Sequence, residues 1–282
     1  VHLTRWTRQG QAGISSQHLA QLLLIAEEEA VVAVVHSPAL TDELAELAWW
    51  CMPTIENARL MLMRDVVCQG PMGRVLTEFL IEHLAFLHED DVAILDTIAV
   101  MLYSGVLTDE ERLAIWRRGT FRNAHYVPFL ELQADDLPPF KPAHAKLAIA
   151  AAAAAALPGN AWAAMLAKVF AESGQSFLYA LHIILDRPEV QEVVNHTLSA
   201  VWRWCQPLNA LDDATRAAQL AEFDAARPEL APYARALAGF VGINADTVRP
   251  IFLKTTAIGS LMRRKIQPVV TPLLNHIAVL RA

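Results

Sequence analysis

The chain has 282 residues, of which 54% are hydrophobic and 19% charged, with a formal net charge of −7 at pH 7. A chain of this length can bury a large core as one or two domains. Its acidic balance disfavours broad nucleic-acid binding, which requires a basic surface. The longest uninterrupted apolar run, 147–157, is too short for a membrane helix of about 20 residues. We therefore expect no transmembrane segment.

The cysteines point to a reducing compartment. Cys51, Cys68 and Cys205 are an odd number and show no CxxC spacing, so a disulfide framework is not indicated. Near the N-terminus the acidic run 27–29 interrupts the apolar residues, which is unlike a secretory signal. These features together predict a cytoplasmic protein.

The N-terminal part of the chain predicts a succession of amphipathic helices. Ser16 is a candidate cap for a helix through the twenties, and Ser37 with Pro38 is a candidate start for the next. That second helix is expected to stop before Pro53, and Thr54 can cap another. The valine-rich stretch just before Ser37 resembles a strand in composition, but helix signals flank it.

Glycine and proline at 69–73 predict a break, which is followed by a long helix. Its apolar residues keep a period of 3.6 and comprise Leu76, Phe79, Leu80, His83, Leu84 and Leu87. A further apolar helix is expected to end at Ser104-Gly105. Thr108 and Glu111 then form a capping-box pattern at the start of another helix.

The second half has the same helical periodicity. The proline- and aspartate-rich segment 133–142 predicts a linker, so we divide the chain into N-terminal hairpins at 1–132 and C-terminal hairpins at 143–282. Asp186 and Glu189 form a second capping-box pattern. No stretch shows the two-residue period of a strand, so the prediction is an all-α protein.

Two similar clusters suggest a repeat. Trp50-Cys51-Met52-Pro53 and Trp204-Cys205-Gln206-Pro207 each close a helical stretch that opens near a proline. Short connections and a recurring helical format are typical of repeat proteins. We therefore predict a HEAT-like stack of antiparallel helical hairpins, an α-α superhelix, built as one stack or as two packed halves.

Catalytic and metal-binding patterns are missing from the sequence. No phosphate-binding loop or nucleophile elbow occurs. His83 and His88 are five residues apart, which places them on different helix faces, and His83 fits a hydrogen-bonded core position. The acidic run 89–91 fits the first turn of a helix. The remaining histidine–carboxylate pairs with helical spacing are His182 with Asp186 and Glu192 with His196. We predict no catalytic residue, no metal site and no cofactor.

One polar and aromatic segment stands out, the arginine corner at 116–126. Guanidinium groups beside aromatic rings suit carboxylates, phosphates and acidic peptides. The candidate binding residues are Arg117, Arg118, Arg122, Asn123, His125 and Tyr126. In the structural alternative, the arginines of this corner form ion pairs with nearby acidic residues at 110–111 or 135–136.

Charge is unevenly distributed along the chain. Residues 1–100 carry 5 basic and 14 acidic side chains, whereas residues 247–282 carry 6 basic and no acidic ones. In one interpretation the basic segment 247–282 docks on the acidic half of the same or a neighbouring subunit, which would give an oligomer. In the other it contacts a membrane surface or another anionic partner.

Part of the chain resembles a known family. The strings PTIENARLML (53–62), GRVLTEFLIEHLAFL (73–87), LTDEERLAIWRRGTFRNAHYVPFL (107–130) and DDLPP (135–139) are similar to the DsrS proteins, which are encoded with the dissimilatory sulfite reductase genes of sulfur-oxidising bacteria. The resemblance covers about a third of the chain. It implies a cytoplasmic accessory or regulatory role in sulfur oxidation and supplies no catalytic residue.

Two functions are compatible with these observations. The first is a non-enzymatic helical scaffold or regulatory protein that binds another protein, which the repeat format and the missing catalytic patterns favour. The alternative is an enzyme or small-anion-binding protein with a pocket between helices, drawing on His83, His182 or the arginine corner.

Overall fold

The structure is a computed structural model, and it describes residues 15–25, 27–87, 90–138, 140–254 and 257–281. Within these ranges every regular element is a helix and no β-strand occurs, which confirms the predicted all-α class. None of the described helices is both long and apolar enough to cross a bilayer.

The chain forms two compact units, Val1–Thr108 and Asp109–Ala282, which we describe separately. The predicted linker 133–142 lies within the second unit. It is tied there by an ion pair of 2.7 Å between Asp135 and Lys168 and by a hydrogen bond of 3.1 Å from the Lys141 amide to Ser176 Oγ. Prolines in this segment therefore mark an irregular connection inside a unit, and the two units divide at Thr108.

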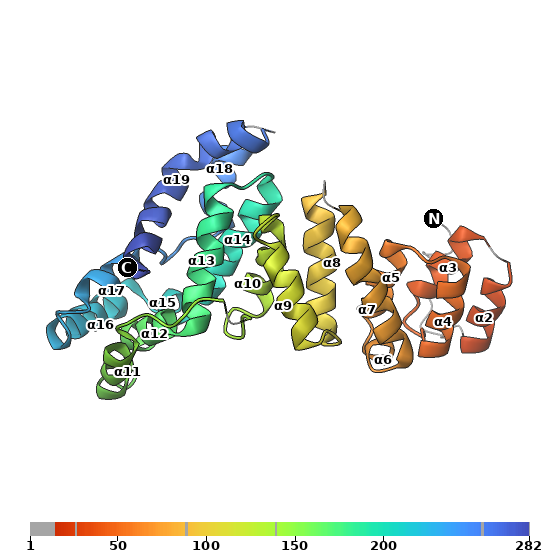
Figure 1. Ribbon diagram of the computed structural model, residues 1–282, viewed down its shortest axis with the longest axis horizontal. Coiled ribbons are helices and arrows are strands. Elements are labelled where there is room, and N and C mark those ends of the chain that lie inside the picture. Colours follow the sequence, from red (N-terminus) through yellow and green to blue (C-terminus); the bar gives the residue numbers. More distant parts are fainter. Residues whose placement is uncertain (1–14, 26, 88–89, 139, 255–256, 282) are drawn as a thin grey trace. The chain divides into compact units, whose positions relative to one another are not determined.

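The first unit contains short helices that pack on neighbours in the sequence (Figure 1). They are α2 (Ser16–Leu23), α3 (Glu28–Val35), α4 (Asp42–Cys51), α5 (Ile55–Leu62), α6 (Asp65–Cys68), α7 (Pro71–His83), the 3₁₀ helix η1 (Leu84–Leu87) and α8 (Asp91–Ser104). Helix α2 contacts α3 and α4, and α5 contacts both α7 and α8. The valine-rich stretch predicted to be helical is α3.

Side-chain caps set several helix starts in the first unit. Thr54 caps α5 as predicted, because its hydroxyl accepts from the Asn57 amide at 3.2 Å. Ser37 does not cap α4, since that helix begins at Asp42 and Thr41 accepts from the Leu44 amide at 3.3 Å. Thr41 combines a capping hydroxyl with the acidic first turn that follows it, which favours the later start.

An aromatic row lies on the partly exposed face of α7. The ring centroid of Phe79 lies 4.6 Å from that of Trp49 and 3.8 Å from that of His83, on which Phe79 stacks. The centroid of His83 lies 5.8 Å from that of Phe86. His83 Nδ1 is hydrogen-bonded to the Phe79 carbonyl at 2.8 Å. The prediction of a hydrogen-bonded histidine is therefore confirmed, but its place in the core is wrong, since His83 is half-buried.

The second unit contains helices that range from 4 residues in α15 and α18 to 22 residues in α19. Its elements are α9 (Asp109–Arg118), η2 (Asn123–Tyr126), α10 (Val127–Leu132), α11 (Leu147–Ala156), α12 (Ala161–Phe170), α13 (Glu172–Asp186), α14 (Gln191–Trp204), α15 (Gln206–Asn209), α16 (Asp213–Ala226), α17 (Ala231–Ala238), η3 (Ala245–Thr247), α18 (Arg249–Phe252) and α19 (Gly259–Leu280). Helix α13 packs against α12, α14 and α19, so it is central to this unit.

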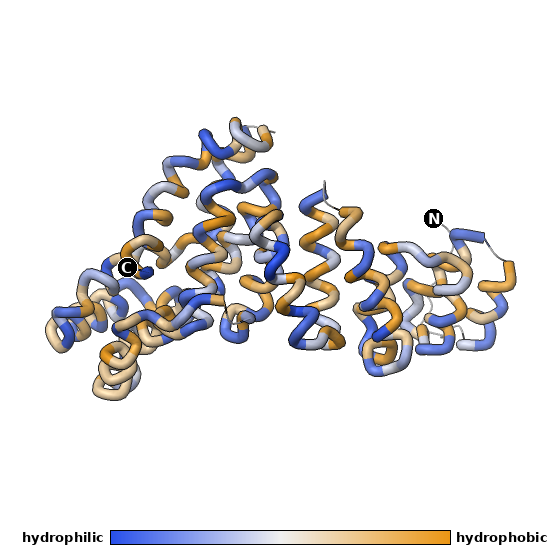
Figure 2. The backbone as a smooth tube through the Cα atoms, in the orientation of Figure 1, coloured by the Kyte–Doolittle hydropathy of each residue, from blue (hydrophilic) through white to orange (hydrophobic). Residues whose placement is uncertain are grey.

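Alanines make α11 a thin helix. Figure 2 shows it as an almost continuous pale orange, the colour of its alanine run. Small side chains let two helix backbones approach closely, and α11 packs against α12 with Ala150 and Ala153 buried. The apolar run of α11 therefore packs helices together within the second unit.

The two tryptophan–cysteine clusters have different environments. Trp204 is buried and stacks on Phe177, with 4.1 Å between ring centroids and an interplanar angle of 13°. Burial raises the pKa of the Cys205 thiol to about 12, so the thiol stays protonated. Trp50 is 80% exposed and Cys51 is also exposed. Similar local sequences therefore occupy a core position in one unit and a surface position in the other.

Candidate functional site

The arginine corner connects α9 to α10 within the second unit. Helix α9 has acidic residues in its first turn and ends with Arg117 and Arg118, an arrangement that the helix dipole stabilises at both ends. The chain turns at Gly119, whose amide donates to the Trp116 carbonyl at 3.0 Å. The short helix η2 then leads into α10.

A close aromatic contact determines the residue at the turn. A Cβ atom on Gly119 would lie 2.5 Å from the Cε1 and Cζ atoms of the Tyr126 ring. That ring packs edge-on against Trp116, with 4.6 Å between centroids. Glycine is thus required at this position because the ring of Tyr126 covers its Cα atom.

We predict that Gly119→Ala destabilises the second unit by about 1–3 kcal/mol, the usual range for overpacking a core. Urea unfolding followed by circular dichroism would measure the change. If the Tyr126 ring is the cause, the same substitution should cost clearly less in a Tyr126→Leu background. An equal cost in both backgrounds would contradict this explanation.

Two of the predicted site residues are interior. His125 is 5% exposed, and its Nδ1 is hydrogen-bonded to the Arg122 carbonyl at 3.1 Å. Tyr126 is fully buried, its hydroxyl has no hydrogen-bond partner among the described residues, and burial raises its pKa. Neither side chain contributes directly to a surface, and both stabilise the corner from inside.

Asn123 has a structural contact. Its Nδ2 donates to the backbone carbonyl of Arg187 at 2.9 Å, which links the corner to the end of α13. Arg122 is half-buried beside it. Asp186, which the sequence placed at a helix start, is instead the last residue of α13, and α14 begins at Gln191 without a side-chain cap. The predicted capping box at 186–189 is therefore wrong.

Arg117 and Arg118 remain available at the surface. Arg117 is exposed and Arg118 is half-buried, and neither guanidinium forms an ion pair or hydrogen bond with any part of the chain that the structure describes. Between them and η2 lies Phe121, which is 94% exposed. The corner thus presents two cationic groups together with one uncovered aromatic ring.

Two of the acidic residues expected to pair with these arginines, Asp135 and Asp136, have other partners. Arg112 Nη2 lies 3.0 Å from Asp136 Oδ2 and 2.8 Å from Gln133 Oε1, and Asp135 pairs with Lys168. Arg112 reaches them because it lies on the half-buried side of α9, whereas Arg117 points to solvent. The 133–136 segment thus does not neutralise Arg117 or Arg118.

A pocket of about 530 Å³ separates the corner from the C-terminal end of α13. Residues 119–123 line one side, and His182, Ile183, Asp186, Arg187 and Glu189 line the other. The charged groups on the α13 side form ion pairs. Asp186 Oδ2 lies 3.3 Å from Arg187 Nε, and Glu189 Oε1 lies 2.9 Å from Arg263 Nη1.

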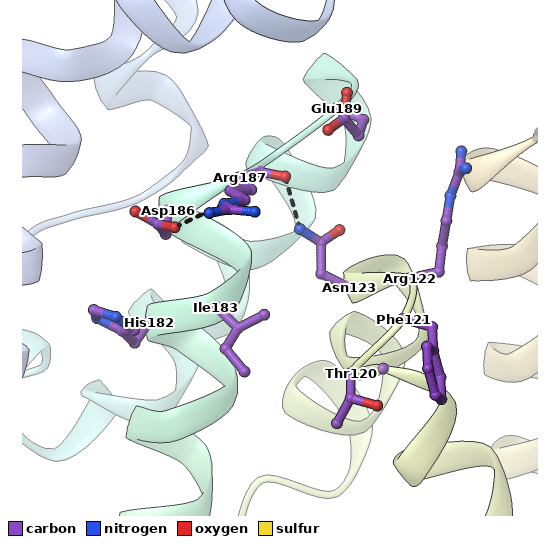
Figure 3. A pocket seen from close by; sticks show the side chains of 10 residues that line it. Thr120, Phe121, Arg122, Asn123, His182, Ile183, Asp186, Arg187 and Glu189 are labelled. Atoms are coloured by element: carbon purple, nitrogen blue, oxygen red, sulfur yellow. Dashed lines mark hydrogen bonds and ion pairs between the residues drawn. The ribbon is translucent and has the colours of Figure 1, made fainter.

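Figure 3 shows that the polar side chains around this pocket do not converge. Ile183 projects toward the corner, whereas His182 points the other way and Arg122 extends away from α13. His182 Nδ1 is buried without a hydrogen-bond partner among the described residues. A catalytic site requires several polar groups directed at one point. The pocket therefore lacks the convergent polar groups that such a site requires.

Metal-binding groups do not gather in the parts of the chain that the structure covers, where no cluster of three or more histidine, cysteine or carboxylate side chains could hold an ion. His88 and Glu89, which belong to the candidate cluster around His83, lie outside the described residues. His196 contacts Glu131 at 3.0 Å, and Glu131 also binds Arg203 at 2.6 Å.

Phe121 was not among the binding residues predicted from the sequence. Its only signal in the sequence was an aromatic residue directly after Gly119-Thr120, where the chain was expected to turn. The sequence offered His182 and the arginine corner as separate candidates for a pocket between helices. That they line the same pocket was not predicted, because nothing in the spacing of residues 182–189 relates them to the distant segment 119–123.

Comparisons with protein-family models, with curated proteins and with solved structures find no match to this chain. The positive findings are the all-α fold, the two compact units and an exposed cationic and aromatic corner.

Proposed function

We propose that this protein is a non-enzymatic helical scaffold or regulatory protein that binds another protein through its arginine corner. The observation that carries the proposal is the pair of arginines without described partners, Arg117 and Arg118, next to the uncovered ring of Phe121. Arginine and aromatic residues are enriched at protein interfaces and dominate their binding energy. The matching partner surface is acidic, with an apolar site for the phenyl ring.

The architecture supports the same function. We infer that the helical hairpins stack in a HEAT-like manner within each unit, because helices adjacent in sequence pack on one another. Stacks of this kind present extended surfaces to partner proteins. In the first unit Trp50 and Phe86 are 80% and 76% exposed, and aromatic side chains are enriched at protein interfaces.

The pocket beside the corner supports an enzyme less well. Arg187 and Glu189 are neutralised by Asp186 and Arg263, so they are not available to bind a substrate charge. The remaining candidate, His182, points away from the corner (Figure 3). A small anion bound there would have to displace an existing ion pair, whereas a protein partner can use the uncovered arginines directly.

The resemblance to DsrS proteins suggests the process in which such a partner acts. We propose a cytoplasmic accessory role in dissimilatory sulfur oxidation, with a partner encoded among the same genes. Capture from the native host that yields partners, none of them encoded with these genes, would reject the sulfur assignment and leave partner binding intact.

The test uses three forms of the protein as bait for quantitative mass spectrometry. Arg117→Ala with Arg118→Ala should lower recovery of the partner at least about tenfold, because interface arginines often contribute more than 1 kcal/mol each. The melting temperature should hardly change, since exposed charges contribute about 0–1 kcal/mol to stability.

The matched control is Arg227→Ala with Arg235→Ala, which removes two exposed or half-buried arginines that already pair with Glu229 and Asp224. This variant should keep the partner. If both double variants capture as much as the parent, or if both lose the partner equally, the arginine corner is not the binding surface.

A further inference from the structure

Three large aliphatic side chains are uncovered where α18 leads into α19. Leu253 is 78% exposed, Ile258 is 68% exposed and Leu261 is 51% exposed. A soluble surface normally leaves such residues scattered singly, and here they fall within nine residues of one segment. Exposed aliphatic side chains that are grouped in this way indicate a surface that binds a partner or a membrane.

Three cationic side chains accompany them. Lys254, Arg264 and Lys265 are exposed, and none forms an ion pair or side-chain hydrogen bond with another described residue. The other cations of this segment are neutralised, Arg249 by Asp246 at 3.4 Å and Arg263 by Glu189 at 2.9 Å. We refer to Leu253, Lys254, Ile258, Leu261, Arg264 and Lys265 as the tip.

The tip has a defined geometry. Arg264 and Lys265 follow Leu261 by three and four residues, so all three share one face of α19. Met262 and Ile266 on the other face are buried. α18 and the start of α19 lie at the same end of the second unit in Figure 1.

Two hydrogen bonds attach the start of α19 to the junction of α13 and α14. The Gly259 amide donates to the Glu189 carbonyl at 2.8 Å, and Gln191 Nε2 donates to the Ala257 carbonyl at 3.3 Å. The part of the tip at the start of α19, with Ile258, Leu261, Arg264 and Lys265, is thus anchored to the second unit.

We propose that the tip docks on a membrane surface that contains anionic lipids. The aliphatic side chains enter the boundary between headgroups and acyl chains, and the three cations lie at the level of the lipid phosphates. Basic side chains next to uncovered aliphatic ones are the combination that such an interface stabilises. This surface is separate from the arginine corner, so the inference does not depend on the proposed function.

An acidic protein is a less suitable occupant. Binding hot spots between proteins are rich in tryptophan, tyrosine and arginine, and leucine is under-represented among them. The tip has no aromatic residue and presents Leu253, Ile258 and Leu261, which partition into hydrocarbon. The net charge of −7 does not prevent approach, because at physiological salt charges more than about 8 Å apart are screened.

The experiment is co-sedimentation of the whole chain with vesicles. We expect binding to vesicles of phosphatidylcholine mixed with phosphatidylglycerol, and much weaker binding to phosphatidylcholine alone. Arg264→Gln with Lys265→Gln should lower the partition coefficient at least tenfold, since each cation near an anionic surface contributes a factor of about five. Leu253→Ser, Ile258→Ser and Leu261→Ser combined should reduce binding to the same extent or more.

Matched controls change the same chemistry elsewhere in the second unit. Arg227→Gln with Arg235→Gln removes two cations, and Ile149→Ser with Leu132→Ser removes two exposed aliphatic side chains. Both controls should bind as the parent does, and circular dichroism should show all variants folded.

Three results would overturn the proposal. In the first, the mixed vesicles do not bind the parent protein, and in the second the controls and the tip variants lose binding equally. In the third, the serine variant binds vesicles as the parent does, but light scattering shows that its self-association differs from that of the parent. That outcome would assign the tip to an interface between copies of this chain.

Discussion

Replacing Trp204 with alanine is expected to destabilise the second unit by about 3–5 kcal/mol, the usual cost of removing a large buried aromatic side chain. Trp204 is 2% exposed and stacks on Phe177, and Lys168 Nζ lies 5.8 Å from its ring centroid. Alanine would remove all of these contacts and leave a cavity between α13 and α14. Urea unfolding followed by far-ultraviolet circular dichroism would measure the loss.

Trp50 is the matched control, because it precedes a cysteine and a proline in the same spacing. Because Trp50 is 80% exposed, its side chain buries little surface that the substitution could remove. Trp50→Ala should therefore change stability by less than about 0.5 kcal/mol. Comparable losses for the two variants would mean that both tryptophans are core residues of equivalent repeats. A small loss for Trp204→Ala would instead show that the α13–α14 packing has been described incorrectly.

The sequence predicted those parts of the fold that depend on neighbouring residues. Thr54 lies directly before an amphipathic segment, so a cap and a helix start could be inferred from a few residues. The buried face of α7, with Leu76 and Leu80, followed from the helical period alone. Local chemistry decides these features, and it is fully present in the sequence.

Features that depend on distant segments were not predictable in the same way. Whether Trp50 or Trp204 is buried depends on which helix covers it, and the two clusters look alike in the sequence. The prolines of 133–142 suggested a linker, yet Asp135 and Lys141 bind partners in α12 and α13. The position of a domain boundary is a property of tertiary contacts, which composition reports only indirectly.

In the arginine corner, too, local features were predictable from the sequence and contacts with distant segments were not. Its cationic and aromatic character was visible in the sequence, and Arg117 and Arg118 do lie at the surface. The choice of Arg112 as the partner of Asp136 was not visible, because it depends on how α9 is rotated against the 133–136 segment. His125 and Tyr126 were included as ligands since burial cannot be read from residue type alone.

Gly174→Ala is expected to destabilise the second unit by about 3 kcal/mol, at the upper end of the overpacking range. A Cβ atom there would lie 2.2 Å from the Lys168 carbonyl oxygen and 2.4 Å from that of Val169, and neither backbone atom can rotate away as a side chain can. Helix propensity alone would favour alanine by about 1 kcal/mol, so the sign of the change decides between the two effects. The control is Ser173→Ala one residue earlier, which changes propensity without entering this contact and should be neutral or slightly stabilising. If Gly174→Ala stabilises the protein in urea unfolding, then α12 and α13 are not in close contact at this junction.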